Sequence, residues 1–210
     1  MTPVANQTNI YEINKWLYFL TLCVATLTLL VVKKNLVENE IMAFEILEER
    51  GQMGFFHLIS TLQYASIPLI YLYKFTVVAF LLWIGSFMFG YKVSFSATWH
   101  VAAVSESIFL VAEFLKICWF IFFGSEATIF DIRAFYPFSL MNLFDRSVLD
   151  TKWIYPLKSL NIFEVIYWFL LVHGINYMAK KKRSVAYFIV FSFYVFFFFI
   201  WLGYYVLIYK

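Results

Sequence analysis

Four ionisable side chains lie within one long apolar stretch, residues 97–124, and they are the residues of this chain best placed to do chemistry. The stretch reads ATWHVAAVSESIFLVAEFLKICWFIFFG and carries His100, Glu106, Glu113 and Lys116. In the hydrocarbon core of a bilayer an ionisable side chain costs about 2.5–3.5 kcal/mol unless it finds a partner or water. Glu106 and Glu113 are seven residues apart and share a helix face, whereas Glu113 and Lys116, three apart, have the spacing of an ion pair.

Two kinds of role fit this polar group. In a functional role it is a proton or ion relay, a counter-charge for a substrate, or a socket for a partner's helix. In a structural role Glu113 pairs with Lys116, and Glu106 bonds to a hydroxyl or backbone group of a neighbouring helix. Both roles require other helices to cover this face, and the sequence leaves the choice between them open.

A second, weaker set of polar candidates is Glu164, His173 and Asn176, in the apolar stretch 161–179. Glu164 is near the expected outer end of that stretch, where exposure to lipid headgroups accounts for it. His173 is nine residues further on, on the opposite side of a helix, and is interpreted as a hydrogen-bonded packing residue. The three histidines, including His57 and His100, lack the close spacing of metal ligands.

The chain carries no recognisable catalytic signature. It has no Gly-x-Ser-x-Gly motif around a serine nucleophile and no glycine-rich phosphate loop, and only seven glycines occur in it. The sequence therefore predicts no enzyme, no catalytic residues, no metal and no cofactor.

The composition indicates an all-α integral membrane protein. Of 210 residues, 63% are hydrophobic and 14% are charged, against about 45–50% and about 25% in soluble domains. The apolar runs are continuous rather than alternating, which excludes a β-barrel. The net charge is only +3 and basic residues are scattered apart from one cluster, so nucleic acid is not an expected partner.

The apolar runs divide residues 14–210 into a single multi-span domain after a polar tail, residues 1–13. We expect a bundle of five transmembrane helices, or six if residues 51–91 form two. The clear spans are 14–32, 97–124, 161–179 and 184–209. Residues 51–91 are ambiguous: they form either two short spans joined at Lys74, or an interfacial segment followed by one span over about 68–91. Under either division Pro68 predicts a kink or a helix boundary.

Two segments between the spans are expected to be ordered. Residues 33–50 have a partly apolar face and predict an amphipathic helix at the membrane surface, or a solvated connector. Residues 125–160 are rich in aromatic side chains and predict a structured loop with short helices. Tyr136, Trp153 and Tyr155 in this loop are expected at the membrane interface.

The basic run KKKR at residues 180–183 predicts the orientation. Short loops rich in Lys and Arg remain on the cytoplasmic side, which places this turn inside and both the 125–160 loop and the C-terminus outside. The side of the N-terminus depends on the number of spans. The distribution of basic residues favours six, and the geometry of the 51–91 connection favours five.

Three passages resemble the Yip family of five-span membrane proteins, whose eukaryotic members lie in Golgi and secretory membranes and bind Rab-type GTPases. They are LQYASIPLIYLYKF at 62–75, KVSFSATWHVAAVSES at 92–107, and YPFSLMNLFD at 136–145 followed by the segment 160–191. The resemblance implies a five-span core and a role in a membrane complex or in trafficking. The long cytosolic N-terminal region of the eukaryotic members has no counterpart here, so Rab binding does not carry over.

Two functions follow as expectations. The first is a non-enzymatic accessory or scaffold subunit of the bacterial inner membrane, packed against other integral membrane proteins in secretion, insertion or envelope assembly. The alternative is a small transporter or permease component that uses Glu106 and Glu113. The alternative predicts a water-accessible cavity lined by these charged residues, whereas the first function does not need one.

Overall fold

The structure is a computed structural model that describes residues 11, 13–38, 53–123, 129–145, 148–180 and 182–209. Within these residues the chain is helical, and its one extended contact is an isolated bridge between Ser139 and Asn161. The long helices, in chain order, are α1 (Lys15–Lys33), α3 (Met53–Met88), α4 (Phe95–Phe123), α7 (Ile162–Ala179) and a last rod made of α8 (Arg183–Ile189), η4 (Val190–Val195) and α9 (Phe196–Ile208).

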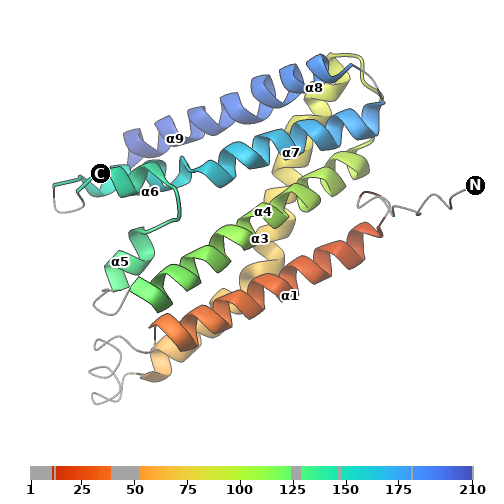
Figure 1. Cartoon of the computed structure of the whole chain (residues 1–210). Coiled ribbons are helices and arrows are strands. Elements are labelled where there is room, and N and C mark those ends of the chain that lie inside the picture. The colour runs from red at the N-terminus through yellow and green to blue at the C-terminus, as the bar shows by residue number, and fades with distance from the viewer. Residues whose placement is uncertain are drawn as a thin grey trace, which may run out of the picture.

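Four segments among the described residues are long and apolar enough to cross a membrane: Lys15–Val37, Thr61–Met88, Ile162–Ala179 and Arg183–Ile208. α4 is as long as these helices, with 29 residues, but it carries the ionisable side chains. The long helices run back and forth along one bundle (Figure 1). The turns at 89–94 and 180–182 lie at one end, and the segment 129–161 lies at the other.

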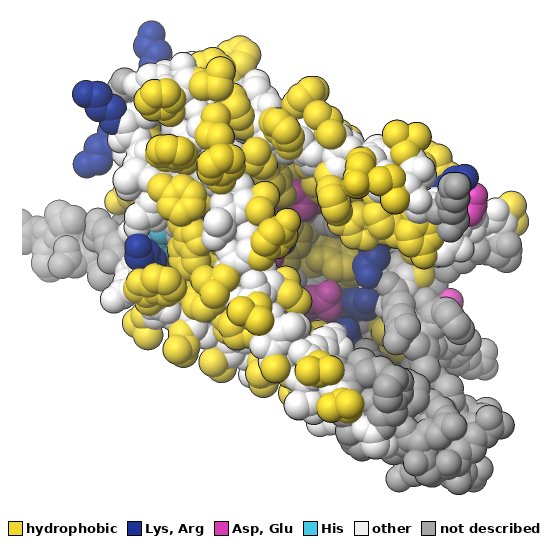
Figure 2. Space-filling view, turned by 180° about the vertical axis from the view of Figure 1, so that it is seen from behind, with side chains coloured by type: hydrophobic (Ala, Val, Ile, Leu, Met, Phe, Trp, Pro, Cys, Tyr) yellow, Lys and Arg dark blue, Asp and Glu magenta, His cyan; other side chains and the backbone are white. Residues whose placement is uncertain are grey.

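α4 is the central helix of the bundle. It packs against α3, α7 and α1, while the last rod packs on α3 and α7. The main core accordingly joins side chains from all of these helices, among them Leu22, Phe75, Leu82, Val101, Tyr167, Leu171, Ile189 and Val190. The outer surface is also apolar, and hydrophobic side chains cover much of the face shown in Figure 2.

The first long helix extends further than the apolar run predicts. Asn14 caps its start by accepting a hydrogen bond from the Trp16 backbone N–H at 3.0 Å. The helix then continues past Lys33 as a turn of π-helix, η2 (Lys34–Glu38). Residues 33–38 of the segment expected to be amphipathic or a connector thus continue α1, and residues 39–52 lie outside the described residues.

Most of the ambiguous segment 51–91 forms a single helix, α3. It runs without a boundary from Met53 to Met88 with Pro68 inside it, so the division into two short spans is wrong, and of the kink or boundary predicted at Pro68 the boundary is wrong. Proline removes one backbone hydrogen bond, but helices in apolar surroundings tolerate it when neighbouring groups adjust. Ser66 makes one such local contact, donating its hydroxyl to the Gln63 carbonyl at 2.8 Å.

The segment before α7 contains short helices: α5 (Ile129–Ala134), the 3-10 helix η3 (Leu140–Leu143) and α6 (Thr151–Ser159). Trp153 and Tyr155 are exposed, but Tyr136 is buried. The Tyr136 ring points into the protein, where it packs edge-on against Phe163, and the interfacial position of the three residues stays a prediction.

The last turn of α7 offers a test of backbone strain. Lys180 closes the helix in the left-handed conformation, with φ 50°, which glycine adopts more easily than lysine. Lys180→Gly should raise the free energy of unfolding in detergent by about 0.5–1 kcal/mol. Lys182→Gly removes the same charge from the same turn at φ −61° and should give no gain. Equal effects of the two substitutions would show that charge, not strain, is responsible.

Candidate functional site

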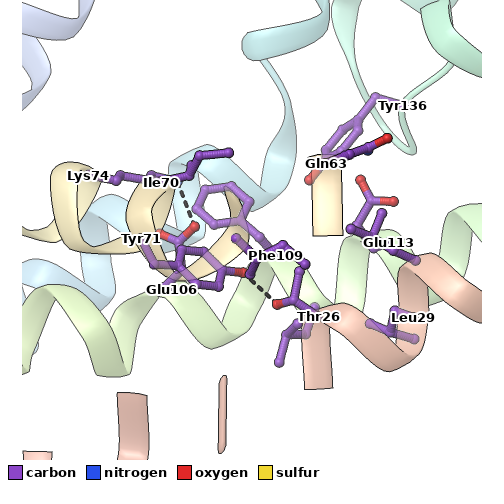
Figure 3. Close-up of a pocket in the computed structure, with 13 residues that line it drawn as sticks. Thr26, Leu29, Gln63, Ile70, Tyr71, Lys74, Glu106, Phe109, Glu113 and Tyr136 are labelled. Carbon is purple, nitrogen blue, oxygen red and sulfur yellow. Dashed lines mark hydrogen bonds and ion pairs between the residues drawn. The ribbon is translucent and has the colours of Figure 1, made fainter. Parts of the chain in front are cut away.

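A cavity of about 360 Å³ lies between α1, α3 and α4. We call it the polar cavity, because it contains both acidic and basic side chains within an otherwise apolar bundle. Figure 3 shows the side chains that line it. They are Thr26, Leu29, Leu30, Gln63, Ile67, Ile70, Tyr71, Lys74, Glu106, Phe109, Leu110, Glu113 and Tyr136. Seen from behind, charged side chains lie in a hollow between hydrophobic surfaces (Figure 2).

The strongest polar contact in the cavity joins two helices. Lys74 of α3 donates its Nζ to Glu106 Oε1 of α4 at 2.6 Å. Only 4% of the Glu106 side chain is exposed, against 38% for Lys74. The Lys74 Nζ also lies 4.5 Å from the centre of the Phe109 ring, in the geometry of a cation–π contact. Two attractive contacts thus hold the ammonium group against α4.

The second oxygen of Glu106 is less well satisfied. Glu106 Oε2 is buried and has no hydrogen-bond partner among the described protein atoms. A buried acceptor without a partner costs about 1–3 kcal/mol, and more when it is charged. Such a group in the wall of a cavity is an available binding point for a donor or a cation.

Glu113 lies near Gln63 and Tyr136 in the polar cavity (Figure 3). Burial raises the pKa of Tyr136, and the Glu113 carboxylate adds to this effect, which is consistent with their closeness. Among the described residues Glu113 has no ion pair, so the expected pair with Lys116 is wrong. The spacing allows such a pair, but the Glu113 side chain lies in the cavity near Gln63 and Tyr136 instead. Lys116 is buried and does not line the cavity.

On the side of the cavity nearest α1, hydrogen bonds between hydroxyl groups link the helices. Thr26 and Tyr71 share a hydrogen bond of 2.6 Å that links α1 to α3. Towards the other end of α1, Tyr18 bonds to Ser107 of α4. These contacts join α1 to the rest of the bundle through polar groups, although most of its surface is exposed.

Glu164 forms a separate buried polar contact. Its Oε1 accepts hydrogen bonds from the Trp168 Nε1 and the Tyr194 hydroxyl, both at 2.9 Å. The side chain is buried, so the expected exposure to headgroups is wrong: the last rod covers this face of α7. The neighbouring Tyr167 hydroxyl is buried without a partner among the described atoms.

His100 and His173 meet around one tyrosine. The Tyr11 ring lies 6.3 Å from each imidazole and stacks on Tyr177 at 5.1 Å. Tyr11, which belongs to the polar tail expected over residues 1–13, is therefore packed against the bundle. Neither histidine lines the polar cavity. In the part of the chain that the structure describes, no group of three or more His, Cys, Asp or Glu side chains is arranged for a metal ion.

Asn176 is the remaining predicted candidate. Its Oδ1 is buried without a hydrogen-bond partner among the described atoms, and it does not line the polar cavity. Of the residues singled out from the sequence, the cavity thus brings together Glu106 and Glu113. It leaves His100, Lys116, Glu164, His173 and Asn176 elsewhere.

Sequence reasoning missed Lys74 as the partner of Glu106, although a signal was present. Lys74 is the one Lys, Arg, Asp or Glu residue between positions 51 and 91. A lone cation in so long an apolar helix requires a carboxylate or water nearby. Tyr71 and Gln63, about one and about three helical turns before Lys74, carried no comparable signal.

No protein-family model, curated protein or solved structure matches this chain. The resemblance to the Yip family therefore remains a prediction from the sequence.

Proposed function

We propose that this chain is a multi-pass membrane protein of the bacterial inner membrane that binds a small polar ligand in the polar cavity, as a transporter or permease component. The observation that carries the proposal is the lining of the cavity by Lys74, Glu106 and Glu113 inside a bundle with an apolar exterior. Ionisable groups within a membrane bundle mark pathways for ions and substrates more often than they serve packing.

The membrane arrangement is part of the proposal. All five long rods cross the bilayer, and α4 packs against α1, α3 and α7. α3 has 36 residues, a length of about 54 Å, which exceeds the hydrocarbon thickness of about 30 Å, so we expect it to be tilted. Lys92 and the KKKR run belong to the turns at one end of the bundle, which the positive-inside rule assigns to the cytoplasm. The segment 129–161 and the end of α9 are then external.

The cavity favours a binding role over a purely structural accessory role. A scaffold subunit needs apolar surface for its partners, but it does not need a partly unsatisfied buried carboxylate. Glu106 Oε2 is buried without a hydrogen-bond partner among the described protein atoms, and such an arrangement is costly unless a ligand or water uses it.

Thiol labelling tests whether the cavity is open to water. In a background where Cys23 and Cys118 are replaced by alanine, Ile70→Cys places a thiol in the cavity wall, and Val77→Cys places one on the same helix outside it. Both positions are exposed, but only water allows the reactive thiolate to form. A small water-soluble thiosulfonate reagent, applied to membranes, should modify Ile70→Cys about tenfold faster or more. Equal rates would contradict the proposal.

A further inference from the structure

Three charged side chains from three helices form one cluster inside the bundle: Lys74 of α3, Glu106 of α4 and Glu164 of α7. We call them the charged cluster. The Lys74 Nζ donates to Glu106 Oε1 at 2.6 Å. It also lies within electrostatic range of the Glu164 carboxylate, and the two carboxylates lie within range of each other. Both carboxylates are buried, with exposed fractions of 4% and 7%, so water screens their charges poorly.

The Lys74 ammonium group lies between the two helices that carry the carboxylates. Its Nζ is 4.5 Å from the centre of the Phe109 ring of α4 and 5.8 Å from the centre of the Tyr167 ring of α7. The centres of these two rings are 5.2 Å apart, so both helices contact the same ammonium group. With 38% of its side chain exposed, Lys74 is also the least confined member of the charged cluster. A single cation is thus placed to serve either carboxylate.

The charged cluster contains two carboxylates and one ammonium group. In the part of the chain that the structure describes, no cation other than Lys74 acts on Glu106 or on Glu164. With all three groups ionised, the cluster would therefore carry one negative charge. The other titratable groups in range are hydroxyls, which are neutral near pH 7 because the pKa of tyrosine is about 10: Tyr71, Tyr136, Tyr167 and Tyr194.

Glu113, the third carboxylate in this region, does not change that count. It lines the polar cavity, but it is coupled there to Lys158 of α6, whose Nζ lies 6.0 Å from the centre of the Tyr136 ring. Glu113 is not among the charges that act on the two carboxylates of the charged cluster. The bundle thus has two separate electrostatic groups, one around Glu113 and the other the charged cluster itself.

The excess negative charge of the cluster calls for a proton. An uncompensated charge in an apolar interior is costly, and a carboxylate avoids this cost by becoming protonated. Two carboxylates that share a site bind such a proton jointly. While Lys74 is bonded to Glu106, the proton belongs on Glu164. Glu164 Oε1 already accepts hydrogen bonds from Trp168 and Tyr194, which leaves the other oxygen to carry the proton.

Two unsatisfied polar atoms beside the carboxylates offer a route for this proton. The Tyr167 hydroxyl and Glu106 Oε2 are both buried without a hydrogen-bond partner among the described protein atoms. Tyr167 is three residues from Glu164 on α7, a spacing that places the two side chains on neighbouring positions of one face, and it is in electrostatic range of both carboxylates. Glu106 lines the polar cavity, whereas Glu164 and Tyr167 do not. Glu106 is therefore the member through which the proton can reach water.

We infer that the charged cluster binds one exchangeable proton and makes H⁺ the ion to which the polar cavity is coupled. The proton lies on Glu164 while Lys74 is bonded to Glu106. It moves to Glu106 Oε2 when the Lys74 ammonium group moves to Glu164, and one O–H bond breaks as another forms. Glu106 then passes the proton to water in the cavity, and the reverse steps take one up. The inference rests on the proposed function and names its coupling ion.

Infrared spectroscopy of the purified full chain tests for this proton directly. The C=O stretching band of a protonated carboxyl group is separate from the bands of carboxylates and amides. At neutral pH, in a detergent without ester groups, the wild-type protein should show this band with the intensity of one carboxyl group per chain. Transfer into D₂O should shift the band, because the proton exchanges through the cavity. A missing band, or a band that D₂O leaves unchanged, would overturn the inference.

Variants that alter the charge balance make the test specific to the charged cluster. Glu106→Gln and Glu164→Gln each leave one carboxylate for Lys74, so either should abolish the band. Lys74→Met leaves two carboxylates without a cation and should about double it. Lys74→Met combined with Glu106→Gln leaves a single carboxylate and should restore the band that Glu106→Gln alone removes, a gain that misfolding cannot produce. Glu113→Gln is the matched control in the same cavity and should leave the band unchanged.

The outcomes separate this inference from the proposed function. If Ile70→Cys is labelled but the band does not follow these charge counts, the proton site is wrong while the open cavity stands. A band that only one of the two glutamine variants removes, or that Glu113→Gln removes, would also contradict the shared proton, since it places the proton on one independent carboxyl group. If Ile70→Cys is not labelled, the proposed function itself fails, even where the band follows the charge counts.

Discussion

Lys74→Met is expected to destabilise the protein far more than Glu106→Gln, although the two substitutions break the same ion pair. Lys74→Met leaves the Glu106 carboxylate, 4% exposed, without its cation. Removing one partner of a buried pair costs about 3–5 kcal/mol, and the partial exposure of Lys74 puts the expected loss near the lower end. Glu106→Gln leaves an ammonium group that reaches solvent and still contacts Phe109, so the expected loss is about 1 kcal/mol.

Denaturant unfolding of the purified protein in one detergent measures both effects. Lys74→Met combined with Glu106→Gln should recover much of the loss, because the double variant no longer buries an uncompensated charge. Lys152→Met is the matched control: it removes a lysine from an exposed pair with Asp150, where the expected change is within about 0.5 kcal/mol. Equal losses for Lys74→Met and Glu106→Gln would show that the carboxylate is not buried as described.

Gly174→Val should be the most damaging single substitution in the apolar core. A Cβ at position 174 would lie 2.5 Å from Val101 Cγ1 and 3.1 Å from the Tyr11 hydroxyl. Glycine at such points lets two helices approach closely within a membrane. Val101 is fully buried and has little room to move, so we expect Gly174→Ala to cost about 1–3 kcal/mol and Gly174→Val more.

The same unfolding assay separates crowding from a general effect of losing glycine. Gly203→Ala changes a helical glycine whose added Cβ would meet nothing within 4 Å, and it should be neutral or stabilising. Val101→Ala should rescue part of the Gly174→Ala loss by making room for the new methyl group. An unchanged Gly174→Ala protein, or a failure of Val101→Ala to rescue it, would contradict the close packing of α4 on α7.

Most of the long helices could be predicted from the sequence, because the boundaries of each nearly coincide with those of one continuous apolar run. The stretch expected at 161–179 forms α7 over Ile162–Ala179, and the one at 97–124 forms α4 over Phe95–Phe123. The 51–91 segment was harder, because its 41 residues suit either two short helices or one long one. The tight connection that two helices would need at Lys74 favours one helix, and α3 packs along α4, a contact that no local sequence pattern reports.

The cavity was predictable only in part, for a similar reason. Helical spacing placed Glu106 and Glu113 on one face, and both line the cavity. Their surroundings come from residues distant in sequence: Lys74 is 32 positions from Glu106, and Tyr194 is 30 positions from Glu164. Helix periodicity shows which side of a helix is polar, but not which neighbouring helix that side faces.

The π-helical turn η4 has a consequence for how this chain tolerates insertions and deletions. A π-turn arises from one residue added to an α-helix, which shifts the following residues by about 100° around the axis. α8 and α9 are therefore out of phase, and the buried Tyr194 lies within the turn that separates them. Deleting one residue from 190–195 would restore a regular helix but rotate α9 away from its contacts. Related chains without this turn should align to it with a one-residue gap here.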